Sequence, residues 1–406
     1  MKKIITLGAC LCMVTAAMAQ NKANNINFEL GNGLTVDMNN GQHQLKLGGY
    51  IQTEAAYNWI SDDNSEKRMG VRRAYFNLGG KFMNDKLSFL LQMNFADSYP
   101  LLDAWIAYKP WKQFSVTVGQ KQSFSGTRSM MFYDYALAMG ERSLSDRTFF
   151  GSGREFGLFL ESQFLMWEKV GIEVDAALTS GDGRNSFGSS TDYDHGGLKY
   201  SGRISVYPLG FFAPGNDLTD TDFAREQTPK LVVGGAYSYN DGTSNPIGEG
   251  HGDFEMYNAE GKARYPDYQK MSLDMMMKYR GMTLLAEYTN AIGAGLKGLY
   301  TAPNPNAPLE PRQIANYLAL GNGYNFQAGY LFPKNWAVDV RYSFVRPEWS
   351  DNQTQIKKSN SIGAGVAKYF IDNRLKVQLL GFYKDYPDLT TKNKEVSIQL
   401  LAHIIF

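Results

Sequence analysis

Cysteine is almost absent from this sequence: the only two, Cys10 and Cys12, lie within the first nineteen residues. That stretch begins with Met1-Lys2-Lys3, continues with a largely apolar run and ends in the small-residue pattern Ala17-Met18-Ala19. These are the parts of a secretory signal peptide, so we expect residues 1–19 to be removed on export. The remaining chain then has no disulfide and must be held together by other means, of which a closed, hydrogen-bonded barrel in lipid is one.

Other absences narrow the class of protein. Beyond the signal no apolar run reaches about 18 residues, which argues against transmembrane helices. The formal net charge is +1, so there is no basic excess and nucleic acid is not an expected partner. No HExxH, GxSxG, GxGxxG or P-loop pattern is present, and none of the four histidines lies in a recognisable metal spacing. We therefore expect no enzyme activity, no cofactor and no metal.

What the sequence does have is long alternation of apolar and polar residues. In the stretch 45–60 the odd positions include Leu45, Ile51 and Trp59, while the even positions include Lys46 and Glu54. The same period of two recurs along the chain and indicates strands with one apolar and one polar face. It predicts about sixteen strands, near 45–60, 71–82, 86–97, 101–109, 113–121, 154–165, 169–180, 198–209, 230–240, 268–280, 281–290, 323–332, 335–346, 360–370, 374–386 and 395–406.

The connections alternate in length. Tight joints such as Asn84-Asp85 and Asp372-Asn373 suit hairpin turns. Long segments rich in Gly, Asp, Asn, Ser and Pro fall near 122–153, 181–197, 210–229, 241–267 and 291–322. Short turns inside and long loops outside are typical of outer-membrane proteins. We expect an all-β fold: residues 20–406 form one transmembrane antiparallel β-barrel, and about sixteen strands leave room for a channel.

The last predicted strand supports this interpretation. Val396, Ile398 and Leu400 share one face with the final residue, Phe406, while the other face is mostly polar. A soluble sandwich rarely places an aromatic carboxy-terminus after so regular an amphipathic strand. We interpret Phe406 as a membrane-assembly signal, which would make the barrel-assembly machinery and outer-membrane lipid its partners.

Three stretches resemble the phosphate-selective porin O/P family: LKLGGYIQTEAAYNW at 45–59, VRRAYFNLGGKFMNDKLSFLLQMNFA at 71–96 with LLDAWIAYKPWKQFSVTVGQ at 101–120, and ERSLSDRTFFGSGREFGLFLES at 141–162. The resemblance implies a sixteen-stranded barrel, usually a homotrimer, that passes small hydrophilic solutes, with segment 122–153 folded into the lumen as a constriction. After Gly119-Gln120-Lys121 the chain continues Gln122-Ser123-Phe124, where many relatives have a Lys-x-Pro arrangement. This departure argues against the basic phosphate site of the family.

The candidate pore residues are cations of the constriction segment and of the inward faces of strands. Arginine suits phosphate and carboxylate groups, so these side chains are expected to contact solute. They are Lys121, Arg128, Arg142, Arg147 and Arg154 in or beside 122–153, and Arg73, Arg203, Lys278 and Arg341 on the wall. The alternative is that the first group pairs with Asp134, Glu141, Asp146 and Glu155 and pins the segment to the wall. Since the wall also carries inward acids, among them Glu54, Asp103 and Asp274, we expect a general or weakly anion-preferring pore.

The sequence thus predicts a porin of the bacterial outer membrane that allows passive diffusion of small hydrophilic solutes and ions. A different class of function stays open. The long segments 241–267 and 291–322 carry Tyr257, Tyr265, Tyr268, Tyr300 and Pro303-Asn304-Pro305, and they would form the contact surface of an adhesin or glycan-docking barrel.

Overall fold

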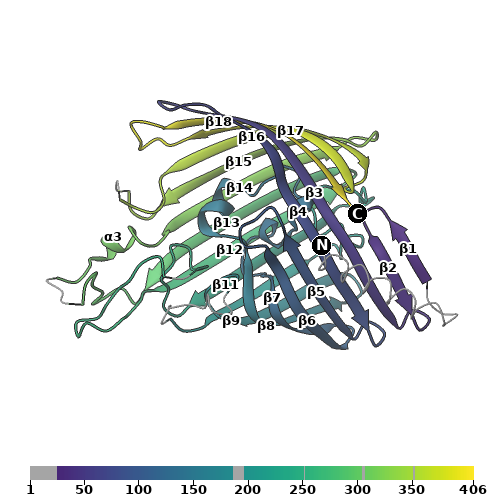
Figure 1. Cartoon of the computed structure of the whole chain (residues 1–406), viewed down its shortest axis with the longest axis horizontal. Coiled ribbons are helices and arrows are strands. Elements are labelled where there is room, and N and C mark those ends of the chain that lie inside the picture. The colour runs from purple at the N-terminus through teal and green to yellow at the C-terminus, as the bar shows by residue number, and fades with distance from the viewer. Residues whose placement is uncertain (1–24, 186–195, 251, 304–306, 351–352) are drawn as a thin grey trace, which may run out of the picture.

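The computed structural model describes residues 25–185, 196–250, 252–303, 307–350 and 353–406. The predicted signal peptide lies outside these residues. Within them the chain is a single antiparallel barrel with very little helix (Figure 1). No helix of the described part is long and apolar enough to cross a membrane.

Sixteen strands form the closed barrel, and each corresponds to one of the sixteen predicted from alternation. Each pairs antiparallel with the next along the chain, and the last strand pairs with the first, with Val396 opposite Trp59, to close the circle. The strands are β3 (His43–Ile60), β4 (Glu66–Phe82), β5 (Leu87–Asn94), β6 (Leu101–Trp111), β7 (Phe114–Gln122), β8 (Arg154–Met166), β9 (Val170–Thr179), β10 (Lys199–Tyr207), β11 (Lys230–Asn240), β12 (Asp267–Tyr279), β13 (Met282–Ala294), β14 (Gly321–Leu331), β15 (Trp336–Pro347), β16 (Ser359–Ile371), β17 (Leu375–Asp385) and β18 (Lys394–Ile405).

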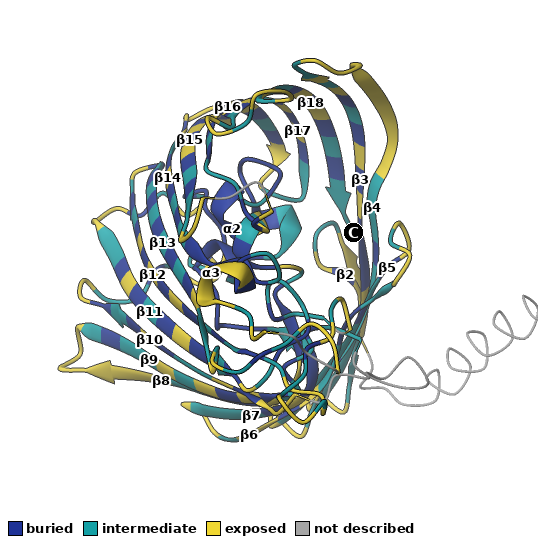
Figure 2. Cartoon of the chain, turned by 90° about the vertical axis from the view of Figure 1, so that its left-hand side faces the viewer, coloured by how far each residue is buried: buried dark blue, intermediate teal, exposed yellow. Residues whose placement is uncertain are grey.

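The alternation places polar side chains inside and apolar ones outside. On β12, Ser272, Asp274 and Lys278 are buried within the barrel, whereas Leu273 is 48% exposed on the outer surface. Buried and exposed residues alternate in the same way along β11–β15 (Figure 2). An apolar outer surface is stable against lipid, and the strand pairings satisfy the backbone, which has no water to bond with there. The predicted transmembrane barrel is confirmed.

An N-terminal hairpin, which the alternation did not predict, lies outside the sixteen-stranded circle. It consists of β1 (Asn25–Glu29) and β2 (Gly33–Met38), and β2 pairs with the first residues of β3. The carboxy-terminal strand stops beside Gly49, so β2 takes over as the partner of β3 below that point. Gly31 and Gly33 have φ of +87° and +73°, a backbone conformation that glycine adopts without strain.

The predicted alternation of short turns and long loops holds with one exception. In an antiparallel barrel successive connections alternate between the two ends, so the link between β10 and β11 falls at the same end as the short turns 83–86, 112–113 and 167–169. That link is the long segment 208–229, and the sequence interpretation had placed most of it, 210–229, among the outer loops. The other long links are 123–153, 180–198, 241–266 and 295–320, and their described residues join the strands at the opposite end, which is extracellular in outer-membrane barrels. Composition and length had marked 210–229 as a loop, but only the pairing order assigns its end.

Candidate functional site

The segment between β7 and β8, residues 123–153, occupies the barrel interior. It contains two 3-10 turns, η1 (Ser129–Met131) and η2 (Asp134–Ala136), and the helix α2 (Leu144–Phe149), which lies inside the ring of strands (Figure 2). The backbone N–H of Ser145 donates to the Ser343 hydroxyl of β15 at 3.1 Å. On β14 a Cβ at Gly323 would lie 2.1 Å from the Ser145 hydroxyl, so the absence of a side chain there lets α2 approach the wall. We call residues 123–153 the inner loop.

Buried ion pairs fix the first part of the inner loop to the wall. The Arg128 Nε donates to Asp274 Oδ1 at 3.0 Å, and Arg203 of β10 also bonds to Asp274. Arg203 donates in addition to the Gly126 carbonyl at 3.0 Å. All three charged side chains are almost fully buried. Buried charges of this kind must be paired, and breaking one pair leaves an uncompensated charge.

A second buried pair lies where the inner loop joins β8. The Arg154 Nε donates to Asp103 Oδ2 at 3.0 Å, and its guanidinium also donates to the Gln92 side chain at 3.1 Å. The exposed fractions of the two charged side chains are 4% and 1%. Arg154 therefore contacts the wall rather than the water of the channel.

The middle of the inner loop reaches the opposite wall. Asp134 accepts a hydrogen bond of 2.5 Å from the Tyr75 hydroxyl and lies 3.5 Å from the Arg73 guanidinium and 3.4 Å from that of Arg142. Burial alone would raise the pKa of Asp134, but the charges of Arg73, Arg142 and Arg154 outweigh it and hold the pKa well below its usual range. Asp134 is therefore ionised and ties the loop to β4.

Further contacts continue around the barrel. Lys376 of β17 donates to the Leu137 carbonyl at 3.0 Å, and Arg341 of β15 donates to the Glu141 carbonyl at 2.8 Å. The ring of Tyr135 lies 5.7 Å from that of Tyr50 on β3 and is stacked on Tyr133 at 5.5 Å. The inner loop thus spans the interior from β7 and β8 to β3, β4 and β17.

A bulge adds a cation that alternation did not predict. Gln52 pairs with Arg73 and Thr53 with Val71, so Arg72 is an extra residue between two paired positions. Arg72 nevertheless contacts groups inside the barrel: Glu54 at 3.1 Å and Glu141 at 3.6 Å. Two consecutive arginines, Arg72 and Arg73, within an alternating strand are the signal in the sequence that could have indicated this bulge, and the sequence analysis did not use it.

The cations predicted as pore residues divide into two groups. Arg128, Arg154, Arg203, Lys278 and Arg341 are buried in contacts within the protein. Arg147 is the most accessible at 38%, followed by Lys121 at 16%, Arg73 at 14% and Arg142 at 11%. The structure adds Arg68, which is 61% exposed, and Arg72.

The accessible arginines cover the carboxylates that they bind. Arg68 and Arg72 both contact Glu54, whose side chain is 4% exposed, and Arg72 and Arg147 both contact Glu141, whose side chain is 10% exposed. Burial acts to raise the pKa of Glu141, but Arg147, Arg341, Arg72 and Lys384 hold it below its usual range. The guanidinium groups therefore face the water while the carboxylates lie beneath them.

Acidic side chains also lie on the inward faces of β8 and β9. Glu161 and Asp175 are directly opposite each other on β8 and β9, and Glu173 lies on the same inward face. Lys121 pairs with Glu161 at 2.7 Å. The interior thus carries both signs of charge, with the exposed arginines toward the long-loop end.

The barrel closes at Phe406. Its backbone exchanges two hydrogen bonds with Gly49 of β3, from Gly49 N to Phe406 O at 2.6 Å and from Phe406 N to Gly49 O at 2.9 Å. The terminal residue thus completes the pairing of β18 with β3.

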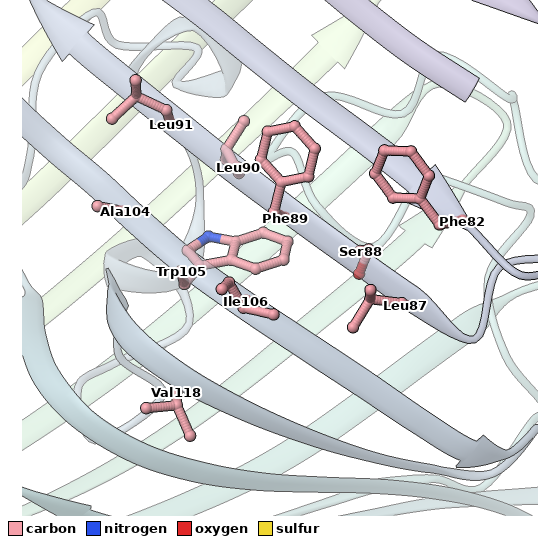
Figure 3. Close-up of a pocket in the computed structure, with 10 residues that line it drawn as sticks. All are labelled: Phe82, Leu87, Ser88, Phe89, Leu90, Leu91, Ala104, Trp105, Ile106 and Val118. Atoms are coloured by element: carbon pink, nitrogen blue, oxygen red, sulfur yellow. The ribbon is translucent and has the colours of Figure 1, made fainter. Parts of the chain in front are cut away.

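An apolar concavity of the outer wall is a different surface. It lies over β4–β7 and is lined by Phe82, Leu87, Phe89, Ile106 and Val118 among others (Figure 3). Ile106 and Val118 are 61% and 55% exposed there. With almost no polar group in its lining, it belongs to the apolar exterior and not to the polar interior.

Comparison with known proteins agrees with these features. Residues 45–163 match the family described as phosphate-selective porin O and P, so the predicted resemblance is confirmed for this part of the chain. No match is found among curated proteins.

Solved structures of porins share the fold over nearly the whole chain. The anion-selective porin from Comamonas acidovorans has a TM-score of 0.57 at 12% identity and covers 90% of this chain and 100% of its own. The outer-membrane channel DcaP of Acinetobacter baumannii gives 0.54 at 12% identity, covering 91% of this chain and 99% of its own. The Salmonella typhi OmpF complex with daunomycin has a TM-score of 0.51 at 12% identity and covers 91% of this chain and 100% of its own. At 12% identity these similarities show that the fold is shared, and no more than the fold.

Proposed function

We propose that this chain, a porin of the bacterial outer membrane, passes small hydrophilic solutes and ions by passive diffusion with a weak preference for anions. The observation that carries the preference is the arrangement of Arg68, Arg72 and Arg147 over Glu54 and Glu141. Guanidinium groups that face water attract anions, while the carboxylates beneath them are shielded from solute. The inner loop is the constriction in this proposal.

The preference is expected to be weak for two reasons. Each accessible arginine already pairs with a carboxylate, so little uncompensated charge is left for a solute. The acids Glu161, Glu173 and Asp175 on β8 and β9 oppose the field of the arginines. This arrangement supports a general pore rather than a dedicated phosphate channel.

Two further parts of the proposal concern assembly and catalysis. We infer a homotrimer, assembled in outer-membrane lipid with the help of the barrel-assembly machinery, in keeping with the trimer form of OmpT, an outer membrane protein of Vibrio cholerae. Chemical cross-linking of the purified protein would give a trimer band, and a monomer at all cross-linker concentrations would contradict this part. We also propose that the protein has no catalytic role, as the porin family match and fold favour a channel.

The surface-binding alternative is weakened by how the long loops pack. Met256, Leu299, Ile314 and Leu318 are fully buried together with Phe149 of the inner loop. Tyr268, one of the candidate contact residues, is 1% exposed and donates its hydroxyl to the Ala319 carbonyl at 2.8 Å. Asn304 and Pro305 lie outside the described residues. The two loops thus form a packed cover over the inner loop, which suits a channel mouth.

Reconstitution in planar bilayers tests the proposal. Purified, folded protein is expected to give stepwise ion conductance, and a salt gradient is expected to give a small reversal potential of the sign for anions. Arg147→Gln removes an accessible charge and should shift the reversal potential toward cations, with phosphate as competitor reducing the current only weakly. Folded protein that leaves the bilayer silent would refute the channel, and a preference for cations would refute the role of the arginines.

A further inference from the structure

Residues 208–229, which we call the lower segment, enter the barrel from the short-turn end. Thr219, Asp220, Thr221 and Asp222 are at most 6% exposed, although they belong to no strand or helix. The neighbouring connections at that end are tight turns, 167–169 between β8 and β9 and 280–281 between β12 and β13. Nothing in the closure of the barrel requires a longer link here.

A lysine of the wall holds the lower segment inside. The Lys278 ammonium donates to the Asn216 carbonyl at 2.5 Å, the Thr219 carbonyl at 2.8 Å and the Thr221 carbonyl at 3.0 Å. An ammonium has three donors, so this side chain is fully used by the backbone of the segment. Lys278 is 0% exposed. It therefore positions the lower segment and does not meet solute, in contrast to its predicted role.

Other inward-facing side chains extend the contact across alternate strands. Gln327 of β14 donates to Asp220 Oδ2 at 2.8 Å, and Tyr369 of β16 lies 3.3 Å from the Thr221 hydroxyl. The ring of Phe223 packs edge-on against that of Tyr369 at 5.0 Å. Because these wall residues project inward from β12, β14 and β16, the lower segment covers that side of the interior.

The lower segment also touches the inner loop. The backbone N–H of Ala138 donates to Asp220 Oδ1 at 2.7 Å, and the Thr219 hydroxyl donates to the Ala136 carbonyl at 3.0 Å. Phe212 shares a buried apolar cluster with Phe132 and Leu137. The two segments thus meet inside the barrel, one from each end.

We propose that the lower segment is a second narrowing element of the channel, which enters from the periplasmic side and holds residues 136–138 of the inner loop in place. This inference rests on the proposed function as a pore. Lys278 and Asp220 are its positioning residues: the first fixes the segment to the wall, and the second fixes the inner loop to the segment. In this proposal solute passes beside β4, which carries the accessible Arg68, Arg72 and Arg73.

The test releases the lower segment without altering the strand pairing. Lys278→Met leaves the three carbonyls without their donor, so the segment is expected to leave the barrel while β12 keeps its backbone bonds. Thr221→Cys reports the release, since the two natural cysteines lie in the predicted signal and no other thiol competes. Maleimide should label the single variant Thr221→Cys slowly. In the double variant with Lys278→Met the labelling rate should be higher by on the order of tenfold or more. Single-channel conductance and the size of the largest polyethylene glycol that enters should both increase.

Lys270→Met is the matched control. Lys270 is equally buried on the same strand, but it donates to the Phe149 and Ile247 carbonyls and to Glu249, and none of these belongs to the lower segment. Labelling at Thr221→Cys should therefore stay slow in this variant. If Lys278→Met fails to fold, as judged by heat-dependent mobility in gels, Asp220→Ala serves as a second variant that releases the lower segment. This variant should also increase current noise, because the inner loop loses the hydrogen bond from the Ala138 backbone N–H to Asp220.

The outcomes distinguish a failure of the lower segment as a narrowing element from a failure of the proposed channel function. Fast labelling with a larger conductance supports the lower segment as a narrowing element. Fast labelling with unchanged conductance and polymer exclusion overturns it, as does slow labelling together with unchanged conductance in both Lys278→Met and Asp220→Ala. A wild-type barrel that folds but carries no current overturns the channel itself, which is a different result.

Discussion

At the scale of single residues, burial decides what a cation in this barrel does. Arg147 and Arg154 flank the same short stretch of the inner loop, yet the first is 38% exposed and the second 4%. An arginine that faces water acts on solute through its field, while a buried one acts on stability through its partner. The sequence alone gives both the same predicted role.

Replacing Arg154 by Met is expected to destabilise the barrel without changing its ion preference. The change leaves Asp103 buried and unpaired, which costs about 3–5 kcal/mol, whereas Arg154 is not exposed to solute. The temperature at which the folded band disappears in gel electrophoresis should fall, and the reversal potential should stay at the wild-type value.

A second change provides the control for this prediction. Asp103→Leu added to Arg154→Met removes the unpaired charge and should restore much of the lost stability. A reversal potential that shifts in Arg154→Met, in protein with wild-type thermal stability, would place Arg154 in contact with solute and contradict the assignment.

At the scale of elements, the closure of β18 on β3 depends on the lack of a side chain at Gly49. A Cβ there would lie 2.7 Å from the Phe406 ring and 2.8 Å from the Tyr75 carbonyl oxygen. The second contact is with backbone, which cannot move aside without breaking the pairing of β3 with β4. Gly49 thus permits Phe406 to pack over the seam.

Gly49→Ala is therefore expected to weaken barrel closure by about 1–3 kcal/mol, the usual cost of overpacking. The fraction of protein that refolds in detergent to the heat-modifiable form should fall. Gly381→Ala on β17 is the matched control, since no atom lies within 4 Å of a Cβ at that position. Equal refolding of the two variants would show that the seam tolerates a side chain.

At the scale of the whole molecule, the inner loop is held to the walls by carboxylates whose pKa values are lowered. Although burial opposes ionisation of both groups, Arg73, Arg142 and Arg154 lower the pKa of Asp134, and Arg147, Arg341 and Arg72 lower that of Glu141. Groups of this kind contribute stability above their unfolded pKa values, 3.8 and 4.5, and the contribution is lost as the pH falls through the lower folded values. Acid should therefore loosen the inner loop.

We expect single-channel current to be steady from neutral pH down to about 4.5 and to become gradually noisier below it, because a released inner loop takes up protons at its ordinary pKa values while the docked loop does not. Asp134→Asn should produce part of this noise at neutral pH. The lower segment responds in the opposite sense, because burial raises the pKa of Asp220 despite the hydrogen bonds from Gln327 and Ala138. An onset of the noise between about pH 6 and 7, well above the expected onset near pH 4.5, would indicate that other groups are responsible and would contradict this account.

The sequence by itself determined the sixteen strands, their inward and outward faces and a last strand that ends at Phe406. These follow from a period of two, which is a local property of the chain and does not depend on which strands are neighbours. It also identified 122–153 and 210–229 as long non-strand segments from their composition and length.

Only the tertiary structure decided where those segments go and what each charge does. The end at which 208–229 lies depends on the pairing order of all preceding strands, and its inward course depends on Lys278, Gln327 and Tyr369, which come from three different strands. The role of an arginine likewise depends on whether a carboxylate from elsewhere in the chain reaches it, as Asp274 reaches Arg128. Such pairings are long-range contacts, and no local pattern of residues encodes them.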